Sequence, residues 1–201
     1  MKDRKLDIRS YLDHVYAYLQ RFIEISREEF DLLAPLLELR VFDKKIVILQ
    51  QDEIDNYLNI VMKGMVRKYI ISRRGEATLQ LATEGHIVQS EISFHTRKPS
   101  DVILETLEPT VLIAIRYEHM QQALDKIPGA ERLGRAIVTQ MFIKKDMRYF
   151  EQLKMSTRER FLAYVQNHPH MMQRVPQKIL ASYLNIKPET FSRLKHLLRK
   201  K

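Results

Sequence analysis

The sequence predicts an α+β fold in which a small antiparallel β-barrel lies between an N-terminal and a C-terminal set of helices. Short runs rich in Val, Ile, Leu, Tyr and Thr, separated by turn-forming residues, fill residues 39–115 and are typical of short strands. Apolar residues three and four apart, typical of helices, precede and follow them. We expect three parts, namely a barrel domain over 1–128, a long helix over 129–154 and an all-α domain over 155–201.

Composition excludes several classes of protein. Of 201 residues, 45% are hydrophobic and 29% charged, which is typical of a globular protein. No apolar run approaches the roughly 18 residues of a membrane span, and the first twenty residues mix charged with apolar positions, unlike a signal peptide. We therefore expect a cytoplasmic protein with no membrane partner. The absence of cysteine excludes disulfides, thiolate nucleophiles and cysteine-ligated clusters.

Positive charge is concentrated at one end of the chain. The formal net charge is +9, and residues 155–201, with ten Lys and Arg against two Glu, carry +8 of it. A neutral body with a basic end suggests a polyanionic partner at that end. The alternative is a basic surface that is merely solvated.

The N-terminal part and the barrel are predicted from periodicity. Residues from about 6 to 35 are predicted helical, and Ser26 with Glu29 forms a capping box that opens a second helix. Turns are expected at Lys63-Gly64 and at Glu84-Gly85. The predicted strands are residues 44–50, 57–62, 66–72, 77–82, 102–108 and 111–115.

Helices return after the barrel. A short helix is predicted over 117–128 and a long one from about Gly129 to Leu153, whose apolar stripe is wide enough to contact both the barrel and a second copy of itself. The predicted dimer face is Leu133, Ile137 and Met141. The alternative is a helix that packs only on its own barrel. Ser156 and Glu159 form another capping box, which opens the C-terminal domain.

Residues 177–198 have the spacing of a helix-turn-helix. Ala181 is small where the second helix must cross the first, and Asn185 stands in the tight turn, where a positive φ is usual. Pro188 suits the first turn of the second helix, because its missing N–H costs nothing there. The small core between the helices is predicted to be Leu180, Leu184, Ile186, Phe191 and Leu194.

The second helix of this pair presents side chains suited to DNA. Arg193 can bond guanine bidentately, and Glu189 can accept from a cytosine amine. The alternative is an i,i+4 ion pair between these two residues on an exposed helix. The predicted base-contacting residues are Glu189, Ser192, Arg193 and His196, and the predicted phosphate-contacting residues are Lys178, Lys187, Lys195, Arg199, Lys200 and Lys201.

This order of elements resembles the CRP/FNR superfamily of bacterial transcription regulators. The resemblance is carried by YLNIVMKGMVRKYI, by EGHIV (similar to the entry to a phosphate-binding cassette), by IPGAERLGRAI, and by ETFSR, which is similar to the Glu-x-x-Ser-Arg of FNR-type recognition helices. It implies a cyclic-nucleotide-binding-like jelly roll, a homodimer built on the long helix, and a two-fold operator with TTGAT-containing half-sites one helical turn apart. It also implies possible contacts with RNA polymerase, while the sign of regulation stays open.

The sequence departs from the family in the cassette. Gln89-Ser90-Glu91 and Ser100-Asp101 stand where cyclic-nucleotide-binding members have Gly-Glu-Leu and an arginine followed by Ser or Thr. Because a buried phosphate without a cation is costly, we expect no cofactor and no usual binding of cyclic AMP. Either the loop is degenerate or the barrel takes another anionic metabolite. The possible effector pocket is Arg67, Tyr69, Ser90, Glu91, Arg97, Ser100 and Asp101.

Two other classes of function are alternatives to a regulator. An enzyme is not expected, because no Gly-rich nucleotide loop and no Gly-x-Ser-x-Gly elbow occur, and His168 with His170 lacks a nearby third metal ligand. The second alternative is a cytosolic metabolite-binding module whose basic tail is incidental. The family's β-hairpin wing is expected to be missing or truncated, with residues 199–201 as a possible substitute for its phosphate contacts.

Overall fold

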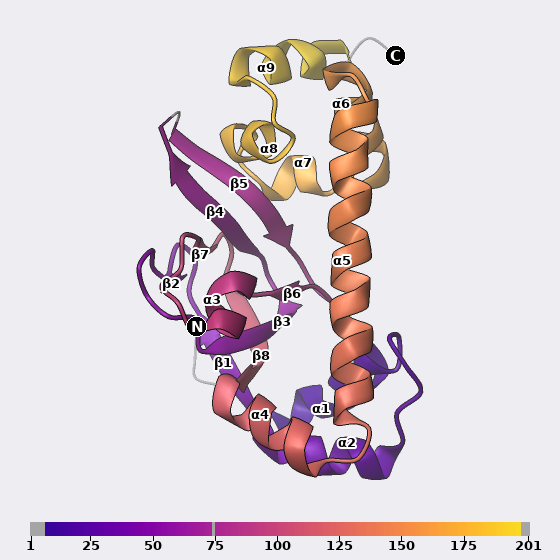
Figure 1. Ribbon diagram of the computed structural model, residues 1–201. Coiled ribbons are helices and arrows are strands. Elements are labelled where there is room, and N and C mark those ends of the chain that lie inside the picture. Colours follow the sequence, from indigo (N-terminus) through magenta and orange to yellow (C-terminus); the bar gives the residue numbers. More distant parts are fainter. Residues whose placement is uncertain (1–6, 74, 198–201) are drawn as a thin grey trace. The chain divides into compact units, whose positions relative to one another are not determined.

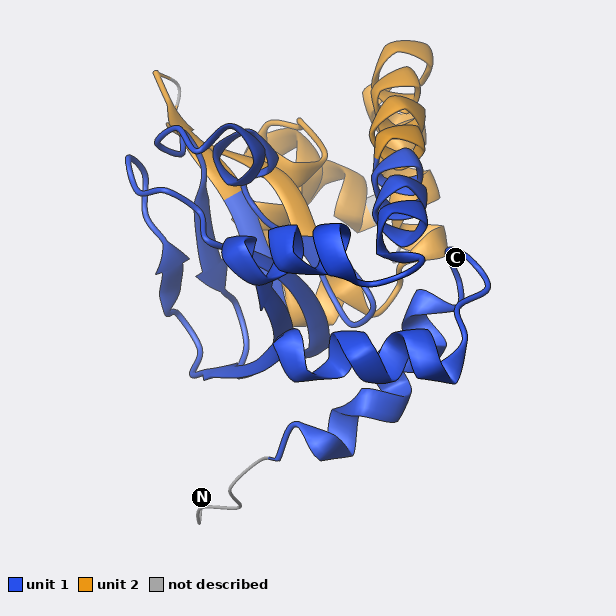
Figure 2. Cartoon of the chain, turned by 60° about the horizontal axis from the view of Figure 1, so that its bottom comes forward, with its two compact units in different colours: residues 1–68, 82–141 blue, residues 69–81, 142–201 orange. Residues whose placement is uncertain are grey.

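The structure, a computed structural model, describes residues 7–73 and 75–197 (Figure 1). It confirms the α+β class, with an antiparallel β-sandwich of jelly-roll type and helices on both sides of it in the sequence. Two compact units are distinguished (Figure 2). The first consists of residues up to Lys68 together with Ala82–Met141, and the second of Tyr69–Leu81 together with the residues from Phe142 on.

The N-terminal helices of the first unit follow the sequence prediction. They are α1 (Arg9–Leu19), α2 (Arg27–Leu33) and the 3₁₀ turn η1 (Ala34–Leu36). The capping box at Ser26 is present. The Glu29 amide donates to Ser26 Oγ at 3.1 Å, and the Ser26 amide donates to Glu29 Oε2 at 2.8 Å. These two bonds satisfy amides that the helix itself leaves without a partner, and so they fix where α2 begins.

The strands form two four-stranded sheets with the orders β1-β8-β3-β6 and β2-β7-β4-β5. The β1/β8, β3/β8, β3/β6 and β2/β7 pairs are antiparallel. All six predicted strand segments contain a strand, whereas β1 and the two-residue β6 were not predicted. The strands are β1 (Leu37–Phe42), β2 (Val47–Leu49), β3 (Tyr57–Lys63), β4 (Val66–Ser72), β5 (Gly75–Ala82), β6 (Ile87–Val88), β7 (Ile103–Thr106) and β8 (Thr110–Arg116).

The remaining helices include the long helix at the predicted place. They are α3 (Glu91–Thr96), α4 (Tyr117–Lys126), α5 (Ala130–Lys154), α6 (Thr157–Asn167), α7 (Met171–Arg174), α8 (Gln177–Tyr183) and α9 (Pro188–Leu197).

Two hydrophobic cores hold the first unit together. One joins α1 and α2 to the barrel and to the start of α5, through Val15, Phe30, Ile113 and Leu133 among others. The other lies within the barrel and includes Leu104, which is almost fully buried. The start of α5 is thus part of the barrel domain because its apolar side chains complete that domain's core.

The turn between β3 and β4 predicts a stability effect. Gly64 has φ +91°, and a Cβ built there would lie 2.5 Å from the Pro109 carbonyl oxygen and 2.9 Å from Thr110 Cα. We expect Gly64→Ala to lower the free energy of unfolding by about 3 kcal/mol, because backbone strain and a clash with backbone atoms add. Urea unfolding measures this loss.

Gly75 is the matched control, since its φ is +100° and nothing lies within 4 Å of a Cβ built there. Gly75→Ala should therefore lower the free energy of unfolding by only about 1–2 kcal/mol, which is the cost of holding an alanine at a positive φ. If the two variants lost equal free energy of unfolding, the backbone atoms near Gly64 would have moved aside and the clash would contribute nothing.

Candidate functional site

The helix pair α8–α9 is built on the spacing that the sequence predicts. The chain turns between the helices at Asn185, which has φ +53°, and the Ile186 amide donates to the Ala181 carbonyl oxygen at 2.9 Å. Asn tolerates this left-handed conformation better than other residues with a Cβ. The small Ala181 at the helix crossing is buried, and so are all of the predicted core positions, namely Leu180, Leu184, Ile186, Phe191 and Leu194.

Two preceding helices complete the core beneath α9. Phe161 of α6 is fully buried and meets Phe191 of α9 edge to face, with ring centroids 5.1 Å apart. Met171 at the start of α7 is also buried. The predicted capping box opens α6, where the Glu159 amide donates to Ser156 Oγ at 3.3 Å and the Ser156 amide to Glu159 Oε2 at 2.8 Å. Buried aromatic packing of this kind fixes α9 as one rigid face.

The outward side of α9 carries the four predicted base-contacting residues. Here they are called the outer face, and all four are exposed, namely Glu189, Ser192, Arg193 and His196. Among the residues that the structure describes, no ion pair joins Glu189 to Arg193, so their side chains are available to a ligand. Glu189, Ser192 and Arg193 lie on the first two turns of α9, the end that enters a major groove in known DNA-binding helix pairs, and His196 lies in its last turn.

Basic residues flank the outer face. Lys178 and Lys187 are exposed and Lys195 is half-buried. The predicted contacts at Arg199, Lys200 and Lys201 lie outside the described residues. Lys187 directly precedes α9 and Lys195 lies within it, so both are close in sequence to the outer face. Charges in these places suit the phosphates on either side of a groove.

The barrel has a second feature, the cassette, defined here as residues 87–102 between β6 and β7. Its hydroxyl groups are bonded to the protein itself. Ser100 Oγ lies 2.9 Å from Ser90 Oγ and 2.8 Å from the Val102 carbonyl oxygen. The Ser90 amide donates to Asp55 Oδ2 at 2.6 Å. Asp55 is buried, and burial raises the pKa of its carboxyl, although the amides of Ser90 and Tyr57 oppose the shift.

Two charged side chains of the cassette, Glu91 and Arg97, are bonded within the protein. Lys68 Nζ forms an ion pair with Glu91 and also donates to the Gln89 carbonyl oxygen at 2.8 Å, and the side chains of Lys68 and Glu91 are only 6% and 22% exposed. Gln89 Oε1 is buried and has no partner among the described residues. Lys68 is not among the predicted site residues, because the alternation of a strand does not indicate that two neighbours, Arg67 and Lys68, are both buried.

Arg97 closes the far end of α3. It has φ +57°, its guanidinium donates to the Asp55 carbonyl oxygen at 2.7 Å and to Asn56 Oδ1, and it lies 4.1 Å from the centroid of the Tyr117 ring. Arg97 therefore connects the end of α3 to the residues that precede β3 and to the first residue of α4.

The other predicted pocket residues do not all gather in the cassette. Ser90 and Ser100 are hydrogen-bonded to each other in the cassette, and Glu91, Arg97 and the exposed Asp101 belong to the same segment, whereas Arg67 is buried on β4. Tyr69 is buried but belongs to the second unit. The predicted pocket is thus only partly assembled in the first unit.

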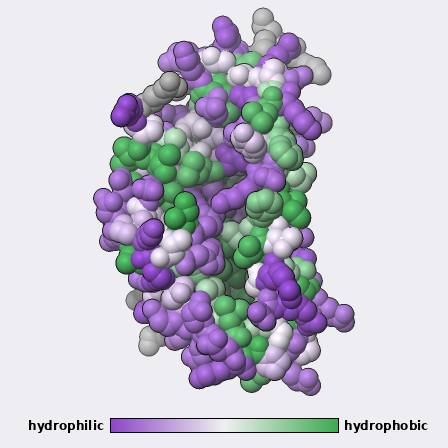
Figure 3. Space-filling view, viewed as in Figure 1, coloured by the Kyte–Doolittle hydropathy of each residue, from purple (hydrophilic) through white to green (hydrophobic). Residues whose placement is uncertain are grey.

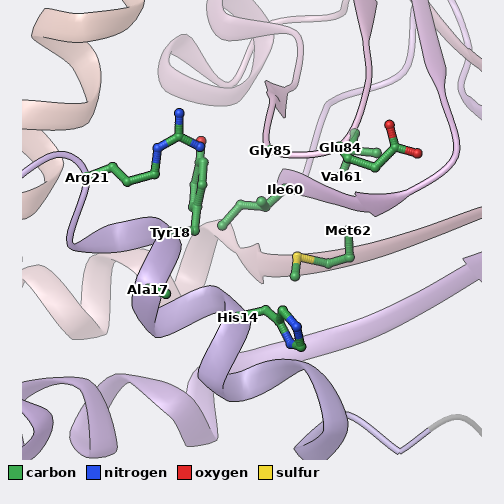
Figure 4. A pocket seen from close by; sticks show the side chains of 9 residues that line it. All are labelled: His14, Ala17, Tyr18, Arg21, Ile60, Val61, Met62, Glu84 and Gly85. Atoms are coloured by element: carbon green, nitrogen blue, oxygen red, sulfur yellow. The ribbon is translucent and has the colours of Figure 1, made fainter.

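A cavity of about 350 Å³ lies outside the cassette, between α1 and β3 (Figure 4). Tyr18 and Ile60 form apolar parts of its wall, and Arg21 and His14 stand at its edge. Burial raises the pKa of Tyr18 to about 12, with Arg21 opposing the shift. Its remaining lining residues are Ala17, Val61, Met62, Glu84 and Gly85.

In helix α5 the residues of the predicted dimer face lie toward the core of their own chain. Leu133 is buried in the barrel core, and Ile137 and Met141 pack against the same cluster, so these three serve the chain's own fold. Other apolar side chains of the helix are exposed, and Figure 3 shows hydrophobic residues interrupting the hydrophilic surface along α5. The exposed stripe is Val138 (54%), Phe142 (64%), Ile143 (47%), Met147 (59%), Tyr149 (57%), Phe150 (48%) and Leu153 (67%).

Two absences concern the described part of the chain. Among residues 7–73 and 75–197, no three His, Asp or Glu side chains gather closely enough to hold a metal ion. His168 instead lies beside Tyr164, with ring centroids 5.0 Å apart. Within the same ranges, no helix combines the length and hydrophobicity that crossing a membrane requires.

Comparisons with known proteins agree with this architecture. Residues 39–126 match the model of the cyclic nucleotide-binding domain. The catabolite activator protein of Thermus thermophilus is 22% identical with a TM-score of 0.54, the aligned region covering 91% of this chain and 87% of that one. FixK2 from Bradyrhizobium japonicum is 17% identical with a TM-score of 0.64 and coverages of 81% and 84%.

The global regulator CLP of Xanthomonas campestris, described as responsive to c-di-GMP, is 18% identical with a TM-score of 0.65 and coverages of 87% and 92%. A search of curated protein sequences gave no match. These likenesses show the fold, which extends in each case over most of both chains.

Proposed function

We propose that this chain, which has the cyclic nucleotide-binding barrel and the overall fold of the CRP/FNR-type regulators, is a sequence-specific DNA-binding transcription regulator. The observation that carries the proposal is the helix pair α8–α9. Its core positions are buried while the outer face, made of Glu189, Ser192, Arg193 and His196, is exposed beside lysines. That combination is what a helix-turn-helix needs in order to insert its second helix into a major groove.

Each residue then has a role. Arg193 bonds guanine O6 and N7, Glu189 accepts from a cytosine amine, and Ser192 and His196 contact neighbouring base edges. Lys178, Lys187 and Lys195, with Arg199, Lys200 and Lys201, neutralise phosphates and so set affinity more than specificity. The relatives named above as an activator and as a global regulator support this class of function.

The regulator acts as a homodimer. The support is the exposed stripe on α5, seven large apolar side chains that the chain does not bury within its own fold. A contiguous exposed apolar surface of this kind marks an interface, and a helix pairing with its own copy buries the same residues on both sides. The two outer faces would then read a palindromic operator.

Cyclic AMP is not the effector in this proposal. A cyclic phosphate buried in the cassette needs a cation or several N–H donors. Lys68 is already paired with Glu91, and Arg97 with carbonyl and amide oxygens, while the hydroxyls of Ser90 and Ser100 face each other. These residues do not fit a cyclic nucleotide, because binding would have to break an internal ion pair.

Three further points belong to the same proposal. The protein is not an enzyme, it works in the cytoplasm, and RNA polymerase is the partner that would turn DNA binding into regulation. The rival is a metabolite-binding module with an incidental basic end, for which the cavity beside Tyr18 is the one specific observation.

One experiment tests function and effector together. Fragments bound by the protein are selected from random duplex DNA without nucleotide, with cyclic AMP and with c-di-GMP. We expect a palindrome with TTGAT-like half-sites in all three arms at equal affinity. Enrichment of no sequence would reject the regulator and favour the metabolite-binding module. A palindrome that appears only with a nucleotide would overturn the interpretation of the cassette.

A further inference from the structure

The second unit includes a piece of the barrel. Residues Tyr69–Leu81, which form most of the β4–β5 hairpin, group with the C-terminal helices rather than with the rest of the sheets (Figure 2). Strand β5 is the last strand in the order β2-β7-β4-β5, so one of its edges has no partner strand among those the structure describes. An edge strand leaves amide and carbonyl groups to be satisfied by something other than a sheet.

Ser182 of α8 forms hydrogen bonds with two backbone groups on this edge of β5. The Thr78 amide donates to Ser182 Oγ at 2.9 Å, and the Ser182 hydroxyl donates to the Glu76 carbonyl oxygen at 3.0 Å. The Thr78 amide and the Glu76 carbonyl point to the same side of β5, because the two residues are two apart on the strand. The Ser182 hydroxyl therefore bonds both groups, as a residue of a neighbouring strand would. Thr78 is buried and Ser182 half-buried, so the bond from the Thr78 amide is partly shielded from water, whereas the bond to the exposed Glu76 is not.

An arginine of α5 makes a second connection at the next residue. Arg148 donates to the Tyr183 carbonyl oxygen at 2.9 Å and also to the Leu79 carbonyl oxygen, and its guanidinium lies 3.9 Å from the centroid of the Tyr183 ring. Tyr183 is the last residue of α8, where helix carbonyls lack internal partners and a positive charge is favourable. Tyr164 of α6 packs on the same ring, with centroids 5.5 Å apart.

These contacts hold the residues that directly precede the turn between α8 and α9. Ser182 and Tyr183 are followed directly by Leu184 and Asn185, the turn that sets the direction of α9. Opposite them, Leu180 and Ala181 face the core shared with α9. Helix α8 is therefore held between α9 and an anchor formed by β5 and Arg148.

We propose that the hairpin 69–81 and Arg148 are positioning elements of the DNA-binding unit, which hold α8 and through it the angle of α9. The inference rests on the proposed function. It makes the DNA-binding unit discontinuous, because a segment of the barrel strands belongs to it together with the C-terminal helices. Ser182 and Arg148 touch no base or phosphate in this arrangement, so they should act on affinity without choosing the sequence.

The test compares Ser182→Ala and Arg148→Gln with matched controls in the full chain. Alanine is the better helix former, so Ser182→Ala does not weaken α8 itself. Gln177→Ala is the control for α8, at an exposed position, and Lys144→Gln removes the same charge from an exposed position of α5. Ser182→Thr keeps the hydroxyl and should restore binding. The measurements are affinity for the selected operator and for random duplex, base preference, and hydrogen exchange at the Thr78 amide.

We expect Ser182→Ala and Arg148→Gln each to weaken binding to the operator and to random duplex by the same factor of about ten, while base preference stays unchanged. Ser182→Ala should also raise exchange at the Thr78 amide. The controls and Ser182→Thr should match the wild type. Wild-type operator affinity in Ser182→Ala, or unchanged protection of the Thr78 amide, would overturn the inference. If the wild type binds no duplex, the proposed function fails, and the exchange measurement alone decides whether β5 anchors α8.

Discussion

Replacing Phe142 and Phe150 with glutamate is expected to give monomers and to lower affinity for the full operator by at least about 100-fold. Both rings are largely exposed in the chain, at 64% and 48%, so the substitutions leave the fold of the protomer intact. In a dimer built on α5 the same positions are buried, and four carboxylates there would be desolvated without partners. Losing the second protomer removes the effective concentration that makes the second half-site easy to bind, a factor of roughly 10²–10⁴.

The control is a variant in which two glutamates are added to α5 at positions outside the exposed stripe. Gln140 and Gln152 are exposed polar residues of α5, so Gln140→Glu with Gln152→Glu should leave both dimer and operator affinity close to those of the wild type. Light scattering after size exclusion gives the mass, and titration of full and half operators gives the affinities. A Phe142→Glu, Phe150→Glu protein that stays dimeric would place the interface elsewhere.

Arg193→Ala is expected to reduce operator affinity by roughly 5- to 150-fold, which corresponds to about 1–3 kcal/mol, and to relax preference at one base pair of each half-site. Arg193 is exposed and has no ion-pair partner among the described residues, so its removal leaves the helix pair folded. The physical reason is the loss of two charge-assisted hydrogen bonds to a guanine edge. Selection from random duplex with the variant measures both effects.

Lys187→Ala is the comparison for this variant. Lys187 is exposed and precedes α9, where it suits a phosphate. Its removal should weaken all sequences alike and reduce the slope of log affinity against log salt by about 0.9 for the lost contact. An Arg193→Ala protein with unchanged sequence preference would show that Arg193 contacts only the backbone.

The sequence predicted best those features that short-range steric rules control. The helix pair is one case. The needs for a small residue at Ala181, a positive φ at Asn185 and apolar residues at the crossing all act within about twenty residues. The capping boxes at Ser26 and Ser156 are another, since their bonds span three residues. Strand β1 was missed because it is half-buried along most of its length, so no alternation marks it.

Contacts between distant segments set the limits of prediction. Lys68 and Glu91 are 23 residues apart, and their pairing depends on how β4 passes α3. The apolar residues of α5 were recognised, but not which of them are exposed, because a wide stripe fits either a barrel or a second helix.

The amino-acid sequence by itself determined the order of elements, the α8–α9 turn and the charged side chains of the outer face, because local backbone preferences and helical periodicity act along the chain. Only the tertiary structure decided that Leu133 belongs to the core, that Lys68 is neutralised by Glu91, and that Ser182 anchors α8 to β5 across more than a hundred residues. Burial and hydrogen bonding depend on which surfaces meet in space, and the spacing of residues along a chain does not carry that information.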